Sequence, residues 1–305
     1  MNNEFINIYA KFLKKFLKPE KPLKVVFDCS NGTAGSVLNK LLKAKSSKLQ
    51  AIFLNEKPDG NFPAHGPNPL EFNALKQLQN EVKKQKADLG VIFDGDGDRT
   101  GFIDNKGHRV DSDVIASLLI WHLKPKIVVI DVLIGNLIKK ISAQNSYFSF
   151  YVSPVGHYSI KKFMVNKKAD FGYEHSGHYY FKKFYYDVSG ILAAIEVINA
   201  VSKLPYSLAN FVDLLSQYYR SGELNFKVKN PQEILKKIER KLKIHYSKLI
   251  TQNSHLDGLT MEFSDWWFNL RPSNTEPLIR LNIEATSKNI LNQKIKELRN
   301  FLENS

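Results

Sequence analysis

An acidic loop carries the clearest chemistry in this chain of 305 residues, and its sequence is Asp94-Gly95-Asp96-Gly97-Asp98-Arg99. The two glycines let the backbone curl, so the three carboxylates can converge on one hard cation. Magnesium fits such a set because it prefers oxygen ligands and keeps open positions for water or a phosphate oxygen. A calcium-binding EF-hand loop that started at Asp94 would need a glutamate at its twelfth position, where this chain has Asn105.

A solvated acidic turn is the alternative interpretation, since Asp-Gly turns are common. The position of the loop favours a metal site instead. It directly follows an apolar segment that predicts a strand, and ligands of α/β sheets bind at the carboxyl ends of strands. Asp94, Asp96 and Asp98 are therefore the predicted metal ligands.

A second loop, residues 172–178, brings together a carboxylate, a hydroxyl and an imidazole at Glu174, Ser176 and His178. Such a set can grip sugar hydroxyls, which offer hydrogen-bond donors and acceptors in pairs. His157 lies upstream, just before a predicted helix. Single histidines are usually structural, and a zinc site built from His157, His175, His178 and Glu174 would match no zinc motif and would lack a cysteine. The pattern alone leaves a binding loop and a structural loop open.

A third loop lies between two predicted strands and has the sequence Arg271-Pro272-Ser273-Asn274-Thr275-Glu276-Pro277, with Arg280 just beyond. The Ser273, Asn274 and Thr275 side chains, together with backbone N–H groups of the turn, can surround a phosphate. Arg271 adds a charged, bidentate donor. A polar β-turn with two prolines is the alternative.

The hydrophobic pattern predicts the elements that position these loops. The predicted strands are residues 23–28, 49–54, 87–93, 126–131, 148–153, 223–228, 259–263, 266–270 and 278–285, and a further strand starts at residue 170. The predicted helices are residues 36–44, 69–86, 112–123, 135–144, 158–166, 187–203, 231–245 and 288–303.

This order predicts an α/β protein with two similar mixed α/β domains, followed by an α+β domain with an antiparallel sheet. Strands that alternate with helices predict a parallel sheet in the first two domains. The predicted organisation is a linker helix at 1–21, an α/β domain with the acidic loop at 22–111, an α/β domain with the second loop at 112–217, and the α+β domain at 218–305.

Composition and charge restrict the partners. The net charge of +14 comes mostly from lysines spread over the predicted helices, without a stripe of stacking aromatics, so we expect no nucleic-acid partner. The longest apolar runs, 114–121 and 127–130, are far shorter than the roughly 20 residues of a membrane helix, so we expect no membrane partner. The single cysteine, Cys29, cannot form a disulfide within the chain, which fits a cytoplasmic location.

Taken together, the three loops resemble the phosphohexomutase family, which includes phosphomannomutases and phosphoglucomutases. The family motifs D-G-D-x-D-R, E-x-S-G-H and R-x-S-G/N-T-E-P are matched by residues 94–99, 174–178 and 271–277. The stretches at 28–35, 58–63 and 67–71 are also similar to the family, so the resemblance covers nearly the whole chain.

The resemblance implies a phosphosugar mutase that interconverts hexose 1-phosphate and hexose 6-phosphate through a 1,6-bisphosphate, with Mg²⁺ as cofactor. This chain would correspond to the second, third and fourth of four family domains. Arg99 would act beside the metal and the phosphoryl group. The remaining implied roles are sugar binding by His157, Glu174, Ser176 and His178, and phosphate binding by Arg271, Ser273, Asn274, Thr275 and Arg280.

The sequence departs from the family in three places. The phosphoserine loop of the first domain, Thr-x-Ser-His-Asn-Pro, has no match, since the Ser254-His255 pair lacks Asn-Pro and lies in the last domain. Asn274 replaces a glycine found in many relatives. The segment Ile134-Gly135-Asn136 lacks the usual Ser-Arg, which puts one inter-domain contact in question.

We therefore expect an N-terminally incomplete mutase that is inactive alone: a fragment, a chain with a wrongly assigned start, or one half of a split enzyme whose catalytic domain is a separate chain. A protein that binds magnesium and a phosphosugar without catalysis is an alternative. A magnesium-dependent phosphatase is another, because Asp94 and Asp96 have the spacing of its nucleophile and acid.

Overall fold

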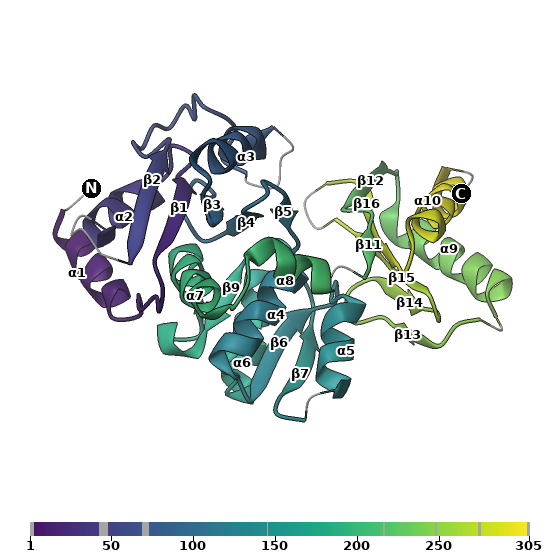
Figure 1. Cartoon of the computed structure of the whole chain (residues 1–305). Coiled ribbons are helices and arrows are strands. Elements are labelled where there is room, and N and C mark those ends of the chain that lie inside the picture. Colours follow the sequence, from purple (N-terminus) through teal and green to yellow (C-terminus); the bar gives the residue numbers. More distant parts are fainter. Residues whose placement is uncertain are drawn as a thin grey trace. The chain divides into compact units, whose positions relative to one another are not determined.

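The computed structural model describes residues 3–42, 48–68, 73–144, 146–215, 217–247, 249–273 and 276–303. The chain forms two compact units (Figure 1). Unit 1 contains residues 1–129, 141–151 and 161–216, and unit 2 contains residues 130–140, 152–160 and 217–305.

The first sheet has the strand order β2-β1-β3-β4-β5. Its strands are β1 (Leu23–Asp28), β2 (Leu49–Leu54), β3 (Leu89–Phe93), β4 (Thr100–Asp104) and β5 (Arg109–Val110). β1 pairs in parallel with β2 and β3, whereas β4 is antiparallel to both β3 and β5. The prediction of a parallel sheet is therefore wrong at this edge, because the acidic loop turns the chain straight back in a hairpin.

Helices flank this sheet. They are α1 (Asn3–Lys14), which packs on α2 (Ala34–Leu42), and α3 (Ala74–Gln85), which packs on β1 and β3. β3 is buried at every position, as expected for a strand covered on both faces, because α7 contacts it as well. The acidic loop therefore starts from a rigid base.

The second sheet has the strand order β10-β9-β8-β6-β7. Its strands are β6 (Ile127–Asp131), β7 (Ser149–Ser153), β8 (Phe171–Tyr173), β9 (Tyr179–Phe181) and β10 (Asp187–Val188). β8, β9 and β10 pair antiparallel, so this sheet is mixed as well and the predicted parallel arrangement is again incomplete. The helices that follow these strands in the chain are α4 (Ser112–Leu123), α5 (Asn136–Gln144), α6 (His157–Lys167), α7 (Gly190–Lys203) and α8 (Leu208–Leu215), with a short 3₁₀ turn, η1 (Lys182–Phe184).

The start of α7 differs from the prediction of a helix from residue 187. Residues 187–188 form β10, and the helix begins at Gly190 because the Ser189 hydroxyl accepts a hydrogen bond from Leu192 N. α4 and α7 pack on each other, and most of their side chains are buried. In the described part of the chain, no single helix is long and apolar enough to cross a membrane, and α7 with α8 would have the length and composition only as a pair bent by 92°.

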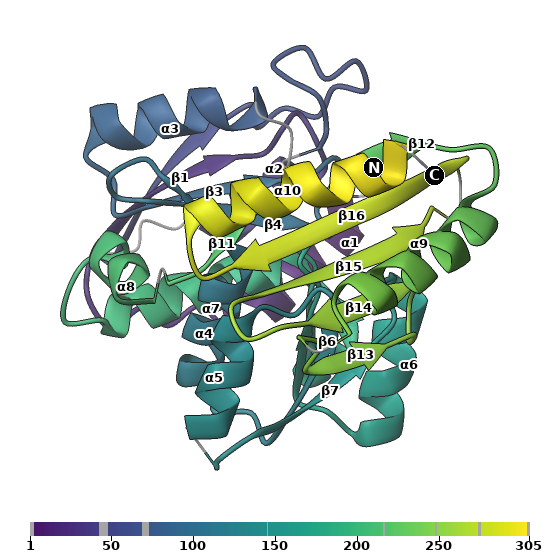
Figure 2. The same cartoon turned by 90° about the vertical axis from the view of Figure 1, so that its right-hand side faces the viewer.

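Unit 2 contains a six-stranded antiparallel sheet in the order β11-β16-β15-β14-β13, with β12 also paired to β16. The strands are β11 (Tyr219–Arg220), β12 (Leu224–Lys227), β13 (Gln252–Ser254), β14 (Leu259–Glu262), β15 (Trp266–Pro272) and β16 (Leu278–Ala285). α9 (Pro231–His245) and α10 (Lys288–Glu303) pack on β15 and β16 respectively (Figure 2). The predicted fold class of two mixed α/β domains and an α+β domain is confirmed, while the predicted domain boundaries stay predictions.

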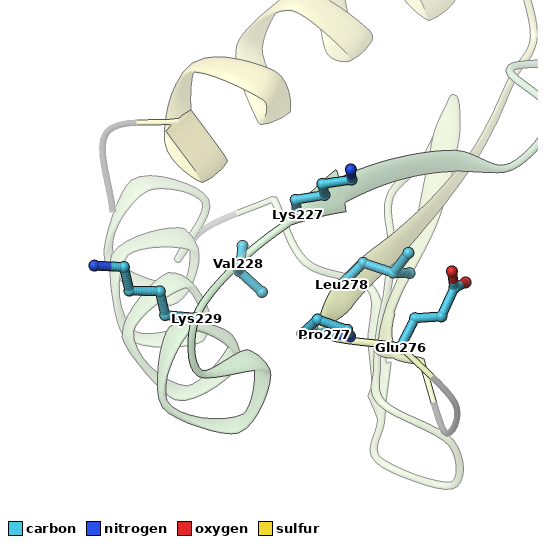
Figure 3. A pocket seen from close by; sticks show the side chains of 6 residues that line it. All are labelled: Lys227, Val228, Lys229, Glu276, Pro277 and Leu278. Carbon is cyan, nitrogen blue, oxygen red and sulfur yellow. The ribbon is translucent and has the colours of Figure 1, made fainter.

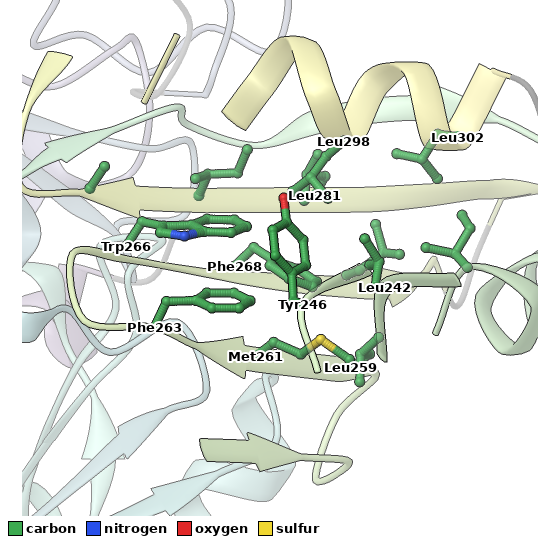
Figure 4. Packing of buried hydrophobic residues seen from close by; sticks show 14 of the residues in the cluster. Leu242, Tyr246, Leu259, Met261, Phe263, Trp266, Phe268, Leu281, Leu298 and Leu302 are labelled. Atoms are coloured by element: carbon green, nitrogen blue, oxygen red, sulfur yellow. The ribbon is translucent and has the colours of Figure 1, made fainter. Parts of the chain in front are cut away.

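The face of this sheet under α9 and α10 holds an apolar core (Figure 4). The Trp266 and Phe263 rings stack with centroids 4.2 Å apart, Tyr246 packs edge-on against both, and Leu298 and Leu302 reach down from α10. Alternate residues of β15 and β16 therefore point to the opposite face of the sheet, and these residues are mostly polar. They are Trp267, Asn269, Arg271, Arg280, Asn282 and Glu284.

The buried Glu284 collects three donors on this polar face. Its carboxylate accepts hydrogen bonds from Asn136 N at 2.8 Å, Trp267 Nε1 at 3.0 Å and Arg220 Nε at 2.8 Å. Arg220 also donates to Leu133 O, and its guanidinium lies 5.7 Å from the Trp267 ring centroid. The segment Ile134-Gly135-Asn136, which lacks the usual Ser-Arg, thus contacts Glu284 through the backbone N–H of Asn136.

We expect Glu284→Ala to lower the free energy of unfolding of unit 2 by about 3 kcal/mol or more, because it leaves the Arg220 charge buried without a counter-ion. Urea unfolding followed by the fluorescence of Trp266 and Trp267 measures the change. The control is Glu233→Ala, which removes an exposed carboxylate of α9 and should cost less than about 1 kcal/mol. Equal losses in the two variants would contradict this role of Glu284.

Candidate functional site

The acidic loop brings its three carboxylates together. Asp94, Asp96 and Asp98 each offer an oxygen, and these oxygens lie within 4.8 Å of one another. Two ligands at about 2.1 Å from a magnesium ion are at most about 4.2 Å apart, so small carboxylate rotations would complete such a set. The predicted metal ligands therefore fit a magnesium ion by donor type and by spacing.

The loop is held in this shape by its own first residue. Asp94 Oδ1 accepts hydrogen bonds from Gly97 N and Arg99 N, and Asp94 Oδ2 pairs with Arg99 Nε at 2.6 Å. Asp94 is 1% exposed, whereas Asp96 is exposed and Asp98 is half-buried. Arg99, the predicted catalytic residue, thus lies against Asp94, one of the predicted metal ligands.

The segment after β1, residues 30–33, packs against the acidic loop and supports it. Thr33 N donates to Gly95 O at 3.0 Å, and Thr33 Oγ1 donates to Asp96 O at 2.8 Å. A Cβ atom on Gly32 would lie only 2.4 Å from Gly95 O, so only glycine allows this approach. Ser30 Oγ also donates to Phe93 O at 2.6 Å, which fixes the end of β3.

The second loop is tied to the acidic loop through the backbone. Thr100 N donates to Gly177 O at 3.0 Å, and Arg99 and His178 form an isolated antiparallel bridge. Gly177 has φ of +94°, and a Cβ atom there would meet Thr100 O at 3.0 Å. The two predicted binding loops therefore form one structural element of unit 1.

His178 joins the side chains of the two loops. Its Nε2 lies 3.5 Å from Asp98 Oδ1, and its Nδ1 lies 3.1 Å from Glu174 Oε2 and 2.8 Å from Ser176 Oγ. The buried Glu174 also accepts a hydrogen bond from the Tyr180 hydroxyl at 2.5 Å. The structure thus brings Glu174, Ser176 and His178 together, as predicted.

Burial and neighbouring hydrogen bonds shift three pKa values in this cluster. Burial raises the pKa of Asp94 to about 6, although the hydrogen bond from Arg99 acts in the opposite direction. The hydrogen bond from His178 lowers the pKa of Asp98 to about 2. Burial alone would lower the pKa of His178, but its hydrogen bonds to Asp98 and Glu174 outweigh burial and raise that pKa to about 9. His178 is therefore a cation at neutral pH that bridges two carboxylates.

Two histidines of the zinc hypothesis lie elsewhere. His157 is exposed at the first residue of α6 and belongs to unit 2, so its predicted part in sugar binding stays a prediction. His175 lies with Asp111 and Asp113, whose ligand atoms are within 4.8 Å of one another. Asp111 caps α4 by accepting from Asp113 N, which gives this second acidic group a structural role.

The third loop lies in unit 2, and the structure describes all its predicted phosphate-binding residues except Asn274 and Thr275, which are outside the described part. β15 extends to Pro272, so the loop is shorter than predicted. Arg271 and Arg280 face each other across β15 and β16, and Arg280 Nη2 donates to Ser273 Oγ at 3.3 Å. The structure therefore places Arg271, Ser273 and Arg280 together.

Glu223 is the residue of this group that sequence reasoning missed. Its carboxylate pairs with Arg271 Nη2 at 3.1 Å and with Arg280 Nη1 at 3.1 Å. Alternation along β12 was the sequence signal for this contact. Asn225 is paired with Arg280, and Glu223, two residues earlier, lies on the same face of the sheet. Without the register of β12 against β16, that signal could not be interpreted.

A pocket of about 620 Å³ borders the third loop at Glu276 and Pro277 (Figure 3). It is lined by Lys227, Val228, Lys229, Glu276, Pro277 and Leu278. The side chains of Lys227 and Lys229 point away from each other, so their charges do not converge (Figure 3). None of the predicted phosphate-binding residues that the structure describes lines this pocket, so it is separate from the arginine pair.

Comparison with known proteins gives one consistent family. Residues 4–107 match the phosphoglucomutase/phosphomannomutase alpha/beta/alpha domain II, residues 111–218 match its domain III, and residues 223–300 match its C-terminal domain. The phosphomannomutase of Methanocaldococcus jannaschii is 37% identical over 97% of this chain and 66% of its own length. This chain spans 59% of the phosphomannomutase of Escherichia coli K12, at 36% identity.

Solved structures agree in fold. A phosphoglucomutase/phosphomannomutase family protein from Burkholderia thailandensis superposes with a TM-score of 0.85 and 25% identity, over 98% of this chain and 64% of that protein. The N-acetylphosphoglucosamine mutase of Aspergillus fumigatus superposes with a TM-score of 0.70 and 15% identity, over 98% of this chain and 65% of that protein, and was solved with GlcNAc-6P and magnesium. Another structure of that enzyme contains glucose 1,6-bisphosphate.

We expect Gly32→Ala to weaken Mn²⁺ binding at the acidic loop by about tenfold or more, because the new methyl group would displace the Gly95 carbonyl. Electron paramagnetic resonance of free Mn²⁺ measures the affinity. The control is Gly60→Ala, since a Cβ atom at Gly60 would have nothing within 4 Å. If the two variants bind Mn²⁺ equally well, the packing of residues 32–33 does not shape the loop.

Proposed function

Because the chain belongs to the phosphoglucomutase/phosphomannomutase family, we propose that it binds Mg²⁺ and a hexose phosphate and acts in the interconversion of hexose 1-phosphate and hexose 6-phosphate. The observation that carries this proposal is the union of the acidic loop with the Glu174–Ser176–His178 group through His178 and the Thr100–Gly177 hydrogen bond. A metal and a sugar bound by such an element would lie next to each other.

The proposed metal ligands are Asp94, Asp96 and Asp98. When bound, magnesium would neutralise charge on a phosphoryl group in transfer. Arg99 lies against Asp94, and its side chain is 30% exposed, so its guanidinium can donate its remaining N–H groups to phosphoryl oxygens. Transfer of a phosphoryl group depends mainly on such positioning and charge stabilisation.

The proposed sugar ligands are Glu174, Ser176 and His178, with His157 as a further contact. Glu174 accepts from the Tyr180 hydroxyl and is held by His178, so its orientation is fixed before a ligand arrives. A carboxylate fixed in this way can accept from two neighbouring sugar hydroxyls, while the Ser176 hydroxyl can donate or accept. Recognition of the sugar ring is the task that this geometry suits.

The proposed ligands of the non-reacting phosphate are Arg271, Ser273, Asn274 and Thr275, with Arg280. The two arginines supply positive charge, and Ser273 supplies a hydroxyl. We also propose a hexose 1,6-bisphosphate as the intermediate. The Aspergillus mutase with glucose 1,6-bisphosphate supports this idea by analogy only, because its identity to this chain is 15%.

The phosphoserine that the family uses has no Thr-x-Ser-His-Asn-Pro counterpart in these 305 residues. The matched domains are II, III and the C-terminal domain. We therefore propose that these residues supply metal, sugar and phosphate binding, and that a serine from outside them supplies the phosphoryl group. A cytoplasmic location, which the single cysteine favours, completes the proposal.

The phosphatase alternative is disfavoured by the relatives. The relatives at 36–37% identity are phosphomannomutases, and the three matched domains are all phosphoglucomutase/phosphomannomutase domains. Asp94 accepts hydrogen bonds from Arg99 Nε and from two backbone N–H groups, which hold its carboxylate in place.

We expect Asp96→Asn to weaken Mg²⁺ binding by about tenfold or more, because it removes one charge from a set of three carboxylates. Isothermal titration calorimetry with MgCl₂ measures this affinity. Asp213→Asn removes a carboxylate that is 68% exposed and pairs with Lys106, and it should leave Mg²⁺ binding unchanged. Similar affinities in the two variants would rule out the acidic loop as the metal site.

We expect mutase turnover of mannose 1-phosphate or glucose 1-phosphate when the chain is mixed with a separately produced domain I of the Methanocaldococcus enzyme and a bisphosphate primer. The chain alone should bind either sugar phosphate in the presence of Mg²⁺ without isomerising it. A coupled assay for hexose 6-phosphate measures turnover. Release of inorganic phosphate without hexose 6-phosphate would favour the phosphatase, and turnover by the chain alone would contradict the need for an outside serine.

A further inference from the structure

The arginines of the third loop are not open to solvent as a pair, because a carboxylate of the same unit bridges them. Glu223 Oε2 lies 3.1 Å from Arg271 Nη2, and Glu223 Oε1 lies 3.1 Å from Arg280 Nη1. Glu223 Oε2 also accepts from Arg280 Nη1 at 3.4 Å. The carboxylate is therefore shared between the two guanidinium groups.

The sheet geometry makes this arrangement a consequence of register. Arg271 and Arg280 are directly opposed across β15 and β16, and Asn225 of β12 is opposed to Arg280 on its other side. Glu223 precedes Asn225 by two residues, so its side chain leans along the same face. The other face holds the apolar core with Leu281 and Ile279, which prevents either arginine from turning away from Glu223 into that layer.

The arginines still have unsatisfied donors. Arg271 Nε and Arg280 Nε are buried and have no hydrogen-bond partner among the described residues. The neighbouring pair on the same two strands, Asn269 and Asn282, also has a buried amide atom without a partner on each side chain. Because these atoms are buried, an anion at this face would bind through the Nη groups of the two arginines, which are the groups that Glu223 contacts.

The charge balance shows what kind of occupant fits. Two guanidinium groups carry two positive charges, and one shared carboxylate neutralises only half of them. A phosphate monoester has enough charge and enough acceptor oxygens to use donors on both guanidinium groups. Glu223 and a phosphate would then compete for the same N–H groups.

We propose that Glu223 is an internal competitor for phosphate, a positioning residue that occupies the Arg271–Arg280 pair between ligands and weakens phosphate binding at that pair. This inference rests on the proposed function. In a reaction through a 1,6-bisphosphate, the intermediate must present each of its two phosphates in turn, so the non-reacting phosphate has to leave the arginines once in each cycle. A carboxylate that returns to them makes this release easier.

The size of the effect follows from the fraction of molecules in which the arginines are free. The apparent affinity of a ligand falls in proportion to that fraction. A partly exposed ion pair that is satisfied in about four of five molecules would reduce phosphate affinity about fivefold. Removal of the carboxylate also removes its repulsion of the incoming anion, so both effects act in the same direction.

The test compares the wild-type chain with Glu223→Gln and Glu223→Ala by titration calorimetry, with inorganic phosphate and with mannose 1-phosphate as probes. We expect both variants to bind each probe about three- to tenfold more tightly than wild type. The control is Asp265→Asn, which removes a carboxylate from the turn before β15, six residues away from Arg271, and should leave the affinity unchanged. Free mannose should show the same affinity for all four proteins.

Equal or weaker phosphate binding by folded Glu223→Gln and Glu223→Ala would overturn the proposal, since a carboxylate that only orients the arginines predicts that loss. Failure of both variants to fold, judged by circular dichroism, would also overturn it by showing that Glu223 is a structural bridge. The proposed function has its own readout in Arg271→Ala. If wild type binds neither probe, or if Arg271→Ala binds them as well as wild type, the phosphate site itself is wrongly assigned.

Discussion

The backbone hydrogen bond between Thr100 N and Gly177 O is the constraint on which the arrangement of the acidic loop and the second loop, residues 172–178, depends. It lies at the start of β4, where the acidic loop has just reversed the chain, and at the turn between β8 and β9. The two loops come from different sheets, and this contact joins them through the backbone alone. His178 then extends the link to Asp98 on one side and Glu174 on the other. A displacement of either loop would therefore affect both the proposed metal site and the proposed sugar site.

Unit 2 separates stability from binding by using the two faces of one sheet. The face toward α9 and α10 buries aromatic and aliphatic side chains, and such burial stabilises folding without any need for specific polar contacts. The opposite face carries two polar centres at its two ends. Glu284 has all its donors in place, which suits a structural role. Arg271 and Arg280 carry two positive charges and share one carboxylate, Glu223, which suits the proposed role in binding an anion.

Much of this could be predicted from the sequence, because local patterns determined it. The spacing of Asp94, Asp96 and Asp98 indicated convergence, and the structure shows it. The bounds of β1, β2, α4, α9, β16 and α10 agree with the sequence-based predictions. These elements have strong apolar periodicity or clear caps, such as the Asn230 side chain that accepts from Glu233 N at the start of α9.

The features that were missed depend on pairing between distant segments. The β4–β5 edge was not predicted, because Thr100–Asp104 is short and follows the acidic loop directly. Glu223 looked like an ordinary surface carboxylate until the register of β12 on β16 placed it beside two arginines. His178 carried no sign of its charge in the sequence, since the elevated pKa comes from carboxylates on two different loops.

The measurement that tests the central claim most directly is anomalous diffraction from crystals of the chain grown with Mn²⁺. We predict one strong peak bounded by carboxylate oxygens of Asp94, Asp96 and Asp98, next to Arg99. A peak at Asp111, Asp113 and His175 with none at the acidic loop would contradict the account.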